Sequence, residues 1–197
     1  MKPKWWEKSK KYLSKKDKVM KRLIKSYKGN LTSRNNFFYS LTRSIISQQI
    51  SVSAADSVFS KFQKKCRGKI KPKTVSKLSI SDLRKCGLSR MKAIGIKSLA
   101  EKILNKSFNP KLIKNMTDEE AIVYLSSLRQ IGRWSSEMVL IFFYNRPNIW
   151  PVQDIGLLRA ISNNYKKKYL PPMSFVNKLK KKFSPYCTLA VMALWYS

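Results

Sequence analysis

The amino-acid sequence predicts an all-α protein, and three observations support this. Helix signals, meaning capping residues followed by apolar residues at helical spacing, recur roughly every 12–20 residues. Alternating patterns are too short to indicate strands. No internal repeat or long low-complexity linker interrupts the chain of 197 residues. A chain of this length can bury a core as one domain or as two small lobes.

The first 30 residues are predicted to form one or two short amphipathic helices. Asp17 is placed to cap the second helix. Trp5 and Trp6 are interpreted as packing residues, for the lobe that does not carry the hairpin described below. The apolar face of the second helix comprises Val19, Met20, Leu23, Ile24 and Tyr27.

A strongly apolar helix is predicted from Phe37 to Gln49, and either Ser51 or Ser53 can cap the next helix. Between the two helices stand the adjacent amides of Gln48 and Gln49. Two such side chains need hydrogen-bond partners in a packed core, so they can instead lie at a surface that inserts into something polar.

The middle of the chain begins with residues 66–80, which are basic and predicted to be connective. A short helix over residues 81–86 is stopped by Gly87. A longer helix follows from Met91 to Leu104. It contains Gly95, at a cost of about 1 kcal/mol against alanine that close helix packing can explain. Residues 110–115 are predicted to form a brief helical turn.

A helical hairpin is predicted next. Thr117 and Glu120 form a capping box at the start of its first helix. Gly132 is expected to supply the backbone freedom for the reversal. The backbone N–H groups of the four residues after Gly132 then lie at a helix N-terminus without intrahelical partners, where phosphate can bind. These residues are Arg133, Trp134, Ser135 and Ser136. From this segment alone, an ordinary helix–turn–helix in a helical core is an equal alternative.

The segment after the hairpin has three parts. Residues 137–144 are an apolar helical run, and the prolines of residues 147–151 break it. Asp154 then stands where a helix over residues 155–161 needs an N-cap, so capping alone is sufficient to explain it. Two further helices are predicted over residues 173–183 and 185–196.

The charge balance favours a polyanionic partner. Lysine and arginine number 42 against 10 acidic residues, a formal net charge of +32. Such a field attracts nucleic acid, although a compositional bias of the source genome is an alternative origin of the lysines.

Histidine is absent, which excludes histidine-based triads and metal sites. Three widely spaced cysteines match no disulfide framework and indicate a reducing compartment. Without a long apolar run or a signal peptide, we expect a soluble intracellular protein, cytoplasmic or at the nucleoid, with no membrane partner.

Four segments in register resemble the helix-hairpin-helix (HhH-GPD) DNA glycosylases, most of all the 3-methyladenine DNA glycosylase II branch. They are residues 41–55 (LTRSIISQQISVSAA), 83–93 (LRKCGLSRMKA), 128–160 and 185–196. The resemblance implies a single glycosylase unit over residues 1–197 with two lobes and a central cleft. One lobe would comprise approximately residues 36–115 with a hairpin lobe 116–150, and the second residues 1–35 and 151–197.

The resemblance also implies roles for particular residues. Asp154 would be the catalytic carboxylate. The flipped base would be bound by Trp134, Met138, Trp195 and Tyr196. DNA would be bound by Gln48, Gln49, Ile131, Gly132, Arg133, Ser135 and Ser136, although Ile50 is an alternative to the two glutamines as the inserted side chain. Backbone carbonyls of Leu128 and Ile131 could hold a monovalent ion, and no side-chain metal site is expected.

The implied activity is a monofunctional glycosylase that removes alkylated purines of the 3-methyladenine type in base excision repair. Strand-cutting relatives carry a lysine nucleophile where Trp134 stands, and no lysine lies between Lys114 and Lys166. Cys187 stands alone where other branches carry an iron–sulfur cluster, so no cofactor is expected. Two departures from the pattern are Gln130, where the family usually has glycine, and Ile155, where some relatives have an aromatic residue.

The expected partner is double-stranded DNA with damaged bases, bound by a monomer. Two rival functions remain: a glycosylase of the same family for an oxidised or deaminated base, and a catalytically inactive helix-hairpin-helix DNA-binding protein.

Overall fold

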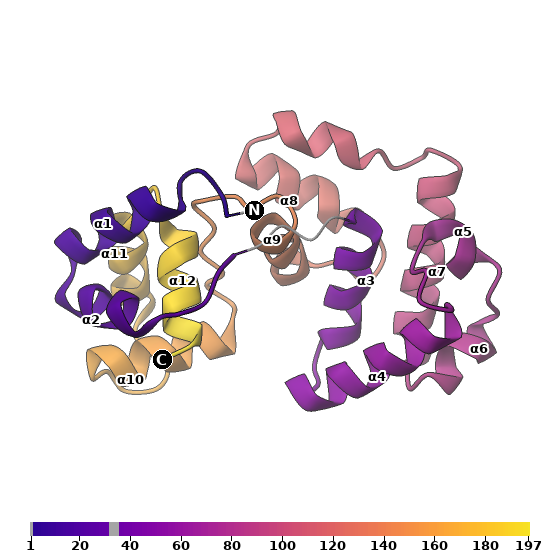
Figure 1. Cartoon of the computed structure of the whole chain (residues 1–197), viewed down its shortest axis with the longest axis horizontal. Coiled ribbons are helices and arrows are strands. Elements are labelled where there is room, and N and C mark those ends of the chain that lie inside the picture. Colours follow the sequence, from indigo (N-terminus) through magenta and orange to yellow (C-terminus); the bar gives the residue numbers. More distant parts are fainter. Residues whose placement is uncertain (1, 32–35) are drawn as a thin grey trace. The chain divides into compact units, whose positions relative to one another are not determined.

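The structure, a computed structural model, describes residues 2–31 and 36–197, and every regular element within these ranges is helical (Figure 1). This confirms the all-α prediction. The elements are α1 (Trp6–Lys16), α2 (Lys18–Ser26), α3 (Phe37–Ser47), α4 (Val52–Lys65), α5 (Pro72–Ser76), α6 (Ile80–Lys85), α7 (Arg90–Leu104), the 3-10 helix η1 (Pro110–Asn115), α8 (Asp118–Ser126), α9 (Arg133–Phe142), α10 (Ile155–Tyr165), α11 (Met173–Phe183) and α12 (Cys187–Trp195).

The chain divides into two compact units. Unit 1 consists of Met1–Ser33 and Leu140–Ser197, so it joins the two ends of the sequence. Unit 2 is the continuous segment Arg34–Val139. The predicted loop residues Gln48 and Gln49 and the hairpin turn lie in unit 2, whereas Asp154 lies in unit 1.

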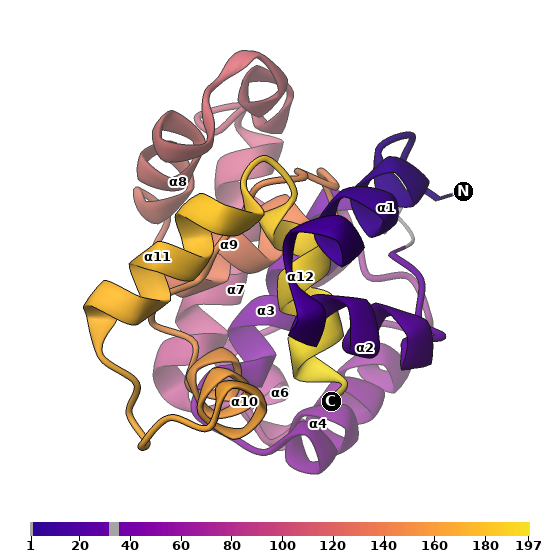
Figure 2. The same ribbon diagram turned by 90° about the vertical axis from the view of Figure 1, so that its left-hand side faces the viewer.

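Unit 1 is built around α12. All residues from Cys187 to Leu194 are buried, which explains why this helix is apolar on every side. Helices α1, α2, α10 and α11 all pack against it, so segments far apart in the sequence lie side by side (Figures 1 and 2). Trp6 is fully buried in this unit, as its predicted packing role requires.

Asp17 joins three helices of unit 1. Its carboxylate accepts hydrogen bonds from the Met20 N–H (2.9 Å), the Tyr165 hydroxyl (3.1 Å) and the Lys182 ammonium (2.6 Å). The first bond confirms Asp17 as the N-cap of α2, and the other two reach α10 and α11. Burial of the carboxylate raises its pKa, but these three hydrogen bonds together outweigh burial and hold the pKa of Asp17 below its ordinary value.

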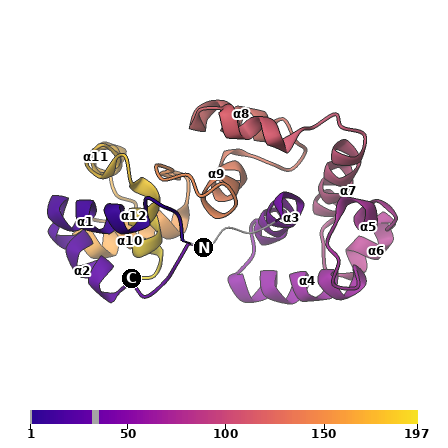
Figure 3. The same cartoon turned by 45° about the horizontal axis from the view of Figure 1, so that its top comes forward.

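Unit 2 is arranged along α7, which packs against α3, α5 and α6 (Figure 3). The prediction that residues 66–80 are only connective was wrong, because α5 lies within them. Pro72 occupies the first turn of α5, and Val75 is its fully buried anchor. A single apolar side chain among lysines gives no periodic pattern, so the short helix was not recognised.

The helix boundaries settle several open points. Ser51, rather than Ser53, caps α4 through the Ala54 N–H, and the predicted capping box of Thr117 and Glu120 is present at α8. A second capping box, formed by Ser79 and Asp82, begins α6 one residue earlier than predicted. None of the helices in the described ranges combines the length and apolarity that a membrane crossing needs.

Replacement of Asp17 by alanine should lower the free energy of unfolding by about 2–4 kcal/mol, because it removes a helix cap and leaves the half-buried Tyr165 hydroxyl without its acceptor. Chemical denaturation of both proteins measures the loss. Since the pKa of Asp17 is depressed in the folded state, the difference should be full above about pH 4 and should shrink as the pH falls further. Lys182→Met is the control. It should cost less, because the ammonium is half-exposed and solvent can replace its partner. Equal losses would contradict a central role for the carboxylate.

Candidate active site and DNA-binding hairpin

The Asp154 carboxylate is held by two donors in unit 1. Its Oδ1 atom accepts the Leu157 N–H at 2.6 Å, which makes Asp154 the N-cap of α10 as predicted. The same oxygen accepts the indole N–H of Trp195 at 2.9 Å. Both partners are donors, which suits the ionised, acceptor-only form of a carboxylate. The carboxylate is half-buried, so it is oriented by the protein without being sealed inside it.

The loop that delivers Asp154 is fixed by the start of α12. The Thr188 side chain donates to the Arg146 carbonyl at 2.6 Å and accepts the Ile149 N–H at 3.0 Å. Trp150 is buried edge-on against Phe183. A turn then follows, closed by the bond from the Asp154 N–H to the Pro151 carbonyl at 3.0 Å. Helix α12 therefore positions Asp154 from both of its ends, through Thr188 and through Trp195.

Aromatic rings surround the Trp195 end of this arrangement. Trp195 stacks on Phe142 with the ring centroids 6.1 Å apart, and sequence spacing alone could not have paired these two residues. Gly156 permits the close approach, because a Cβ there would lie 3.1 Å from Asp154 Oδ1 and 3.7 Å from the Trp195 ring. Tyr196 is 73% exposed and lies against Tyr27, with the centroids 5.5 Å apart.

The hairpin consists of α8, a tight turn and α9, and the last residues of α9, 140–142, belong to unit 1. The reversal uses a left-handed residue, but this residue is Gln130, with φ of 65°, and not Gly132. The prediction that Gly132 supplies the backbone freedom for the reversal was therefore wrong. It followed from glycine being the usual left-handed residue, but here a glutamine adopts that conformation. Gly132 is exposed, and a Cβ built on it would meet nothing within 4 Å. The backbone at Gly132 thus faces open space.

The backbone N–H groups of Arg133, Trp134 and Ser135 precede the first i→i−4 bond of α9. Arg133 and Trp134 are half-buried, whereas Ser135 is buried. The N–H of Ser136 makes that first bond, to the Gly132 carbonyl at 3.0 Å, so its predicted availability was wrong. The side chains of Ile131, Ser135 and Ser136 are buried. This burial extends to the whole of each residue, so contact of these three residues with DNA stays a prediction.

The Arg133 side chain is engaged within unit 2. Its guanidinium donates to both carboxylate oxygens of Glu119 on α8, at 2.9 and 2.6 Å, and lies 3.2 Å from the buried Glu137 on α9. Sequence reasoning missed both glutamates. The available signal was Glu137, a carboxylate inside an otherwise apolar helical run. Arg133 therefore ties the two helices of the hairpin together, and these hydrogen bonds and the neighbouring carboxylates raise its pKa despite partial burial.

The two predicted glutamines differ in their surroundings. Gln48 donates from Nε2 to the Gln130 carbonyl at 2.7 Å and to the Ser135 hydroxyl at 2.8 Å, so its amide braces the hairpin turn. Gln49 has a left-handed backbone with φ of 54°, and the Ile50 side chain after it is 40% exposed. Gln49 and Ile50 are exposed, whereas Gln48 is half-buried, and insertion of any of the three into DNA stays a prediction.

The other predicted positions in unit 2 lie on α9 or before it. Trp134 is half-buried and Met138 is buried, one helical turn apart. The Leu128 carbonyl accepts the Ile131 N–H at 3.1 Å, which leaves a second lone pair on that oxygen. A monovalent ion at Leu128 and Ile131 stays a prediction. In the described part of the chain no group of acidic, cysteine or histidine side chains could hold a metal ion.

The chain belongs to the HhH-GPD superfamily of base excision DNA repair proteins, whose sequence profile matches residues 42–185. It is 33% identical to the alkylbase DNA glycosidase-like protein mag2 of Schizosaccharomyces pombe over 159 residues, which cover 79% of this chain and 75% of that protein. It is 29% identical to DNA-3-methyladenine glycosylase 1 of the same yeast over 191 residues, 93% of this chain and 84% of the relative.

A solved structure gives the same answer for the fold. The S. pombe 3-methyladenine DNA glycosylase Mag1 in complex with abasic DNA superposes with a TM-score of 0.86 at 28% identity, and the match covers 95% of each chain. These likenesses confirm the family and the helix-hairpin-helix glycosylase fold that the sequence predicted.

Substitution of Gly95 by alanine should destabilise the protein by about 1–3 kcal/mol, because the new Cβ would lie 2.7 and 2.9 Å from the Gln130 side chain and 3.3 Å from the Arg129 carbonyl. Adding Gln130→Gly should recover part of the loss, since it removes the clashing atoms and the left-handed strain together. Thermal denaturation of the single and double variants measures both effects. Additive losses would mean that Gly95 does not accommodate Gln130.

Proposed function

We propose that this protein is a monofunctional DNA glycosylase that hydrolyses the N-glycosidic bond of alkylated purines of the 3-methyladenine type in base excision repair. The observation that carries the proposal is the Asp154 carboxylate, oriented by the Leu157 N–H and the Trp195 indole in a chain of this family. An ordinary N-cap needs only the first of these donors, whereas the second also places an aromatic ring beside the carboxylate.

The proposed chemistry follows from charge development on the sugar. As the base leaves, the deoxyribose becomes oxocarbenium-like, and a carboxylate beside it stabilises the positive charge. The same carboxylate can orient or deprotonate the attacking water. Because Asp154 is held by two donors before substrate arrives, little reorganisation is needed during the reaction.

Base recognition is assigned to aromatic and polarisable side chains. Trp195 and Tyr196 in unit 1, with Trp134 and Met138 in unit 2, are the proposed contacts to the flipped base. A methylated purine carries positive charge, and an aromatic face attracts a cation by about 0.5–2 kcal/mol. The indole of Trp195 would then serve both the base and Asp154.

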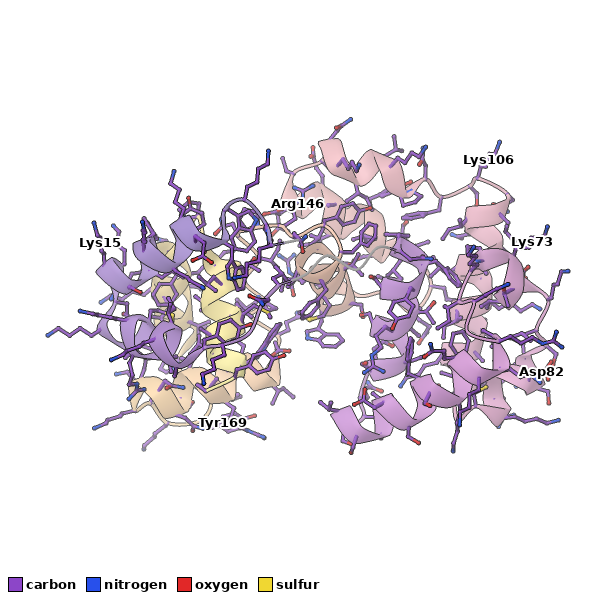
Figure 4. All side chains as sticks on the ribbon, viewed as in Figure 1. Lys15, Lys73, Asp82, Lys106, Arg146 and Tyr169 are labelled. Atoms are coloured by element: carbon purple, nitrogen blue, oxygen red, sulfur yellow. The ribbon has the colours of Figure 1, made fainter. Side chains whose placement is uncertain are left out.

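The proposed partner is double-stranded DNA with a damaged base, bound by a monomer through the hairpin and the basic surface. The first-turn N–H groups of α9 are suited to a phosphate, and Gly132 leaves space for its approach. Lys15 in unit 1, and Lys73 and Lys106 in unit 2, each point outward from the unit that carries them (Figure 4), and such lysines provide sequence-independent attraction. The similar Mag1 structure was solved with abasic DNA, which supports this partner.

Two rival functions are separated by a release assay on a panel of duplexes that carry alkylated, oxidised or deaminated bases. Release of alkylated purines alone supports the proposal. Release confined to an oxidised or deaminated base would assign the rival specificity, and binding without release from any duplex would assign the inactive DNA-binding protein.

Replacement of Asp154 by asparagine should reduce base release by at least about a thousandfold, while affinity for a lesion duplex stays within about tenfold, because the carboxylate serves the transition state rather than DNA binding. Asparagine can still cap α10, so the fold is retained. Single-turnover release and equilibrium binding measure the two quantities. Asp118→Asn, a half-buried acid at the start of α8, is the charge-matched control and should leave both unchanged. Release near the wild-type rate in Asp154→Asn would exclude the catalytic assignment.

The product should be an intact strand with an abasic site that is cut only after alkali or heat. Residues 115–165, which contain the hairpin and Asp154, include no lysine, so the proposed nucleophile is water. Borohydride reduction during turnover should therefore trap little protein on DNA. Efficient trapping would show that an amine reaches the sugar, and the monofunctional assignment would fail even if Asp154 proved essential.

A further inference from the structure

Lys92 on α7 binds the C-terminal end of α3 through hydrogen bonds. Its ammonium donates to the Ile46 carbonyl at 2.9 Å and to the Gln48 carbonyl at 2.6 Å. Carbonyls at a helix C-terminus have no intrahelical donor and carry partial negative charge, so a lysine there is stabilising. The side chain is half-buried, and this desolvation lowers the pKa of Lys92 from its ordinary value. The hydrogen bonds to the Ile46 and Gln48 carbonyls replace those that the ammonium would make with water, so the contact is favourable only while both carbonyls stay in place.

Gln48 carries the connection onward from Lys92 to the hairpin. Its main-chain carbonyl accepts the lysine, while its side-chain amide donates to Gln130 and Ser135. Gln130 in turn lies against Gly95, one turn along α7 from Lys92. Helix α7, the loop after α3 and the hairpin turn therefore form a closed ring of contacts within unit 2.

We propose that Lys92 is a positioning residue that, through Gln48, locks the loop of residues 48–51 to the hairpin turn, so that the side chain inserted into DNA and the phosphate-binding N–H groups are presented as one rigid unit. Gln48 is then a brace, and the inserted side chain belongs to Gln49 or Ile50. The functional part of this inference rests on the proposed glycosylase function.

The physical need for such a lock follows from base flipping, which costs a few kcal/mol that an inserted side chain partly recovers. Insertion helps only if the side chain is aligned with the strand that the hairpin grips. Gln49 also has a left-handed backbone, a strained conformation that persists only where its neighbours are held. Lys92 fixes the residue immediately before it.

The test compares two lysines of the same helix. Lys97, also on α7, donates to the Ser76 and Leu78 carbonyls at 3.2 and 2.8 Å, beside the end of α5. Lys92→Met and Lys97→Met thus each remove one charge and two hydrogen bonds to carbonyls, but only the first touches the loop that meets the hairpin. Single-turnover base release from an alkylated duplex, and affinity for undamaged duplex as a function of salt, are measured for both.

Lys92→Met should slow base release by about tenfold to a hundredfold through misalignment, whereas Lys97→Met should stay within about threefold of wild type. The salt dependence of binding to undamaged DNA should be the same in the two variants, since the lock contributes no phosphate contact. Lys92→Arg, which keeps the donors, should restore part of the lost rate. Equal effects of the two methionine variants on release, or a loss from Lys92→Met explained wholly by a changed salt dependence, would overturn the proposal.

A double-mutant cycle with Gln48→Met tests whether the two residues act in series. If they do, the double variant should lose little more than the more damaging single variant. If the fold losses in release rate of the two single variants multiplied in the double variant, the two residues would have independent roles, and the proposal that Lys92 acts through Gln48 would be overturned.

Amide hydrogen exchange on the protein without DNA separates this inference from the proposed function. Lys92→Met should increase exchange both in residues 46–51 and in residues 130–136, whereas Lys97→Met should affect only the region around residues 76–79. Unchanged exchange in residues 130–136 would overturn the lock. If wild-type protein released no base from any duplex, the glycosylase assignment would fail while the exchange result still decided whether the loop and hairpin are coupled.

Discussion

The bond from the Trp195 indole to Asp154 Oδ1 is the contact on which the orientation of the Asp154 carboxylate depends. A bond between residues 41 positions apart requires that the C-terminus of α12 and the N-terminus of α10 be placed together. Burial of α12 on all sides fixes the position of its C-terminus. Thr188 anchors the loop before Asp154 and so fixes the N-terminus of α10. The core of unit 1 thus serves to place one carboxylate and one aromatic ring side by side.

A second constraint is the scarcity of acids. With 10 carboxylate side chains against 42 cationic ones, few lysines can be neutralised by ion pairs. Several of the acids stabilise local structure. Asp17, Asp82 and Glu120 take part in helix caps, and Glu119 and Glu137 form ion pairs with Arg133 of the hairpin. Lys92 and Lys97 find their partners among main-chain carbonyls at helix ends instead. The remaining positive charge extends over the surface, where it is available to a polyanion.

What the sequence could predict follows from how local each interaction is. The caps at Asp17, Thr117 and Asp154 depend on residues three positions apart, so their patterns were sufficient. The family and fold were recognised because four motifs occur in register. Helix α5 and the partners of Trp195 were not predicted, since one depends on a single buried valine and the other on a ring contact with Phe142 from a different helix. Periodicity carries no information about either.

The hairpin turn shows why the local rule for glycine failed there. A left-handed residue costs a non-glycine side chain about 1 kcal/mol or more, so the rule assigned the reversal to Gly132. The structure instead places Gln130 in that conformation and leaves space for its side chain at Gly95, on a helix distant in the sequence. In return, the Gln130 carbonyl accepts the Gln48 amide. Gly95, which lowers the helix propensity of α7, and Gln130, which departs from the family pattern, therefore form one contact that joins the hairpin to the helix that carries Lys92.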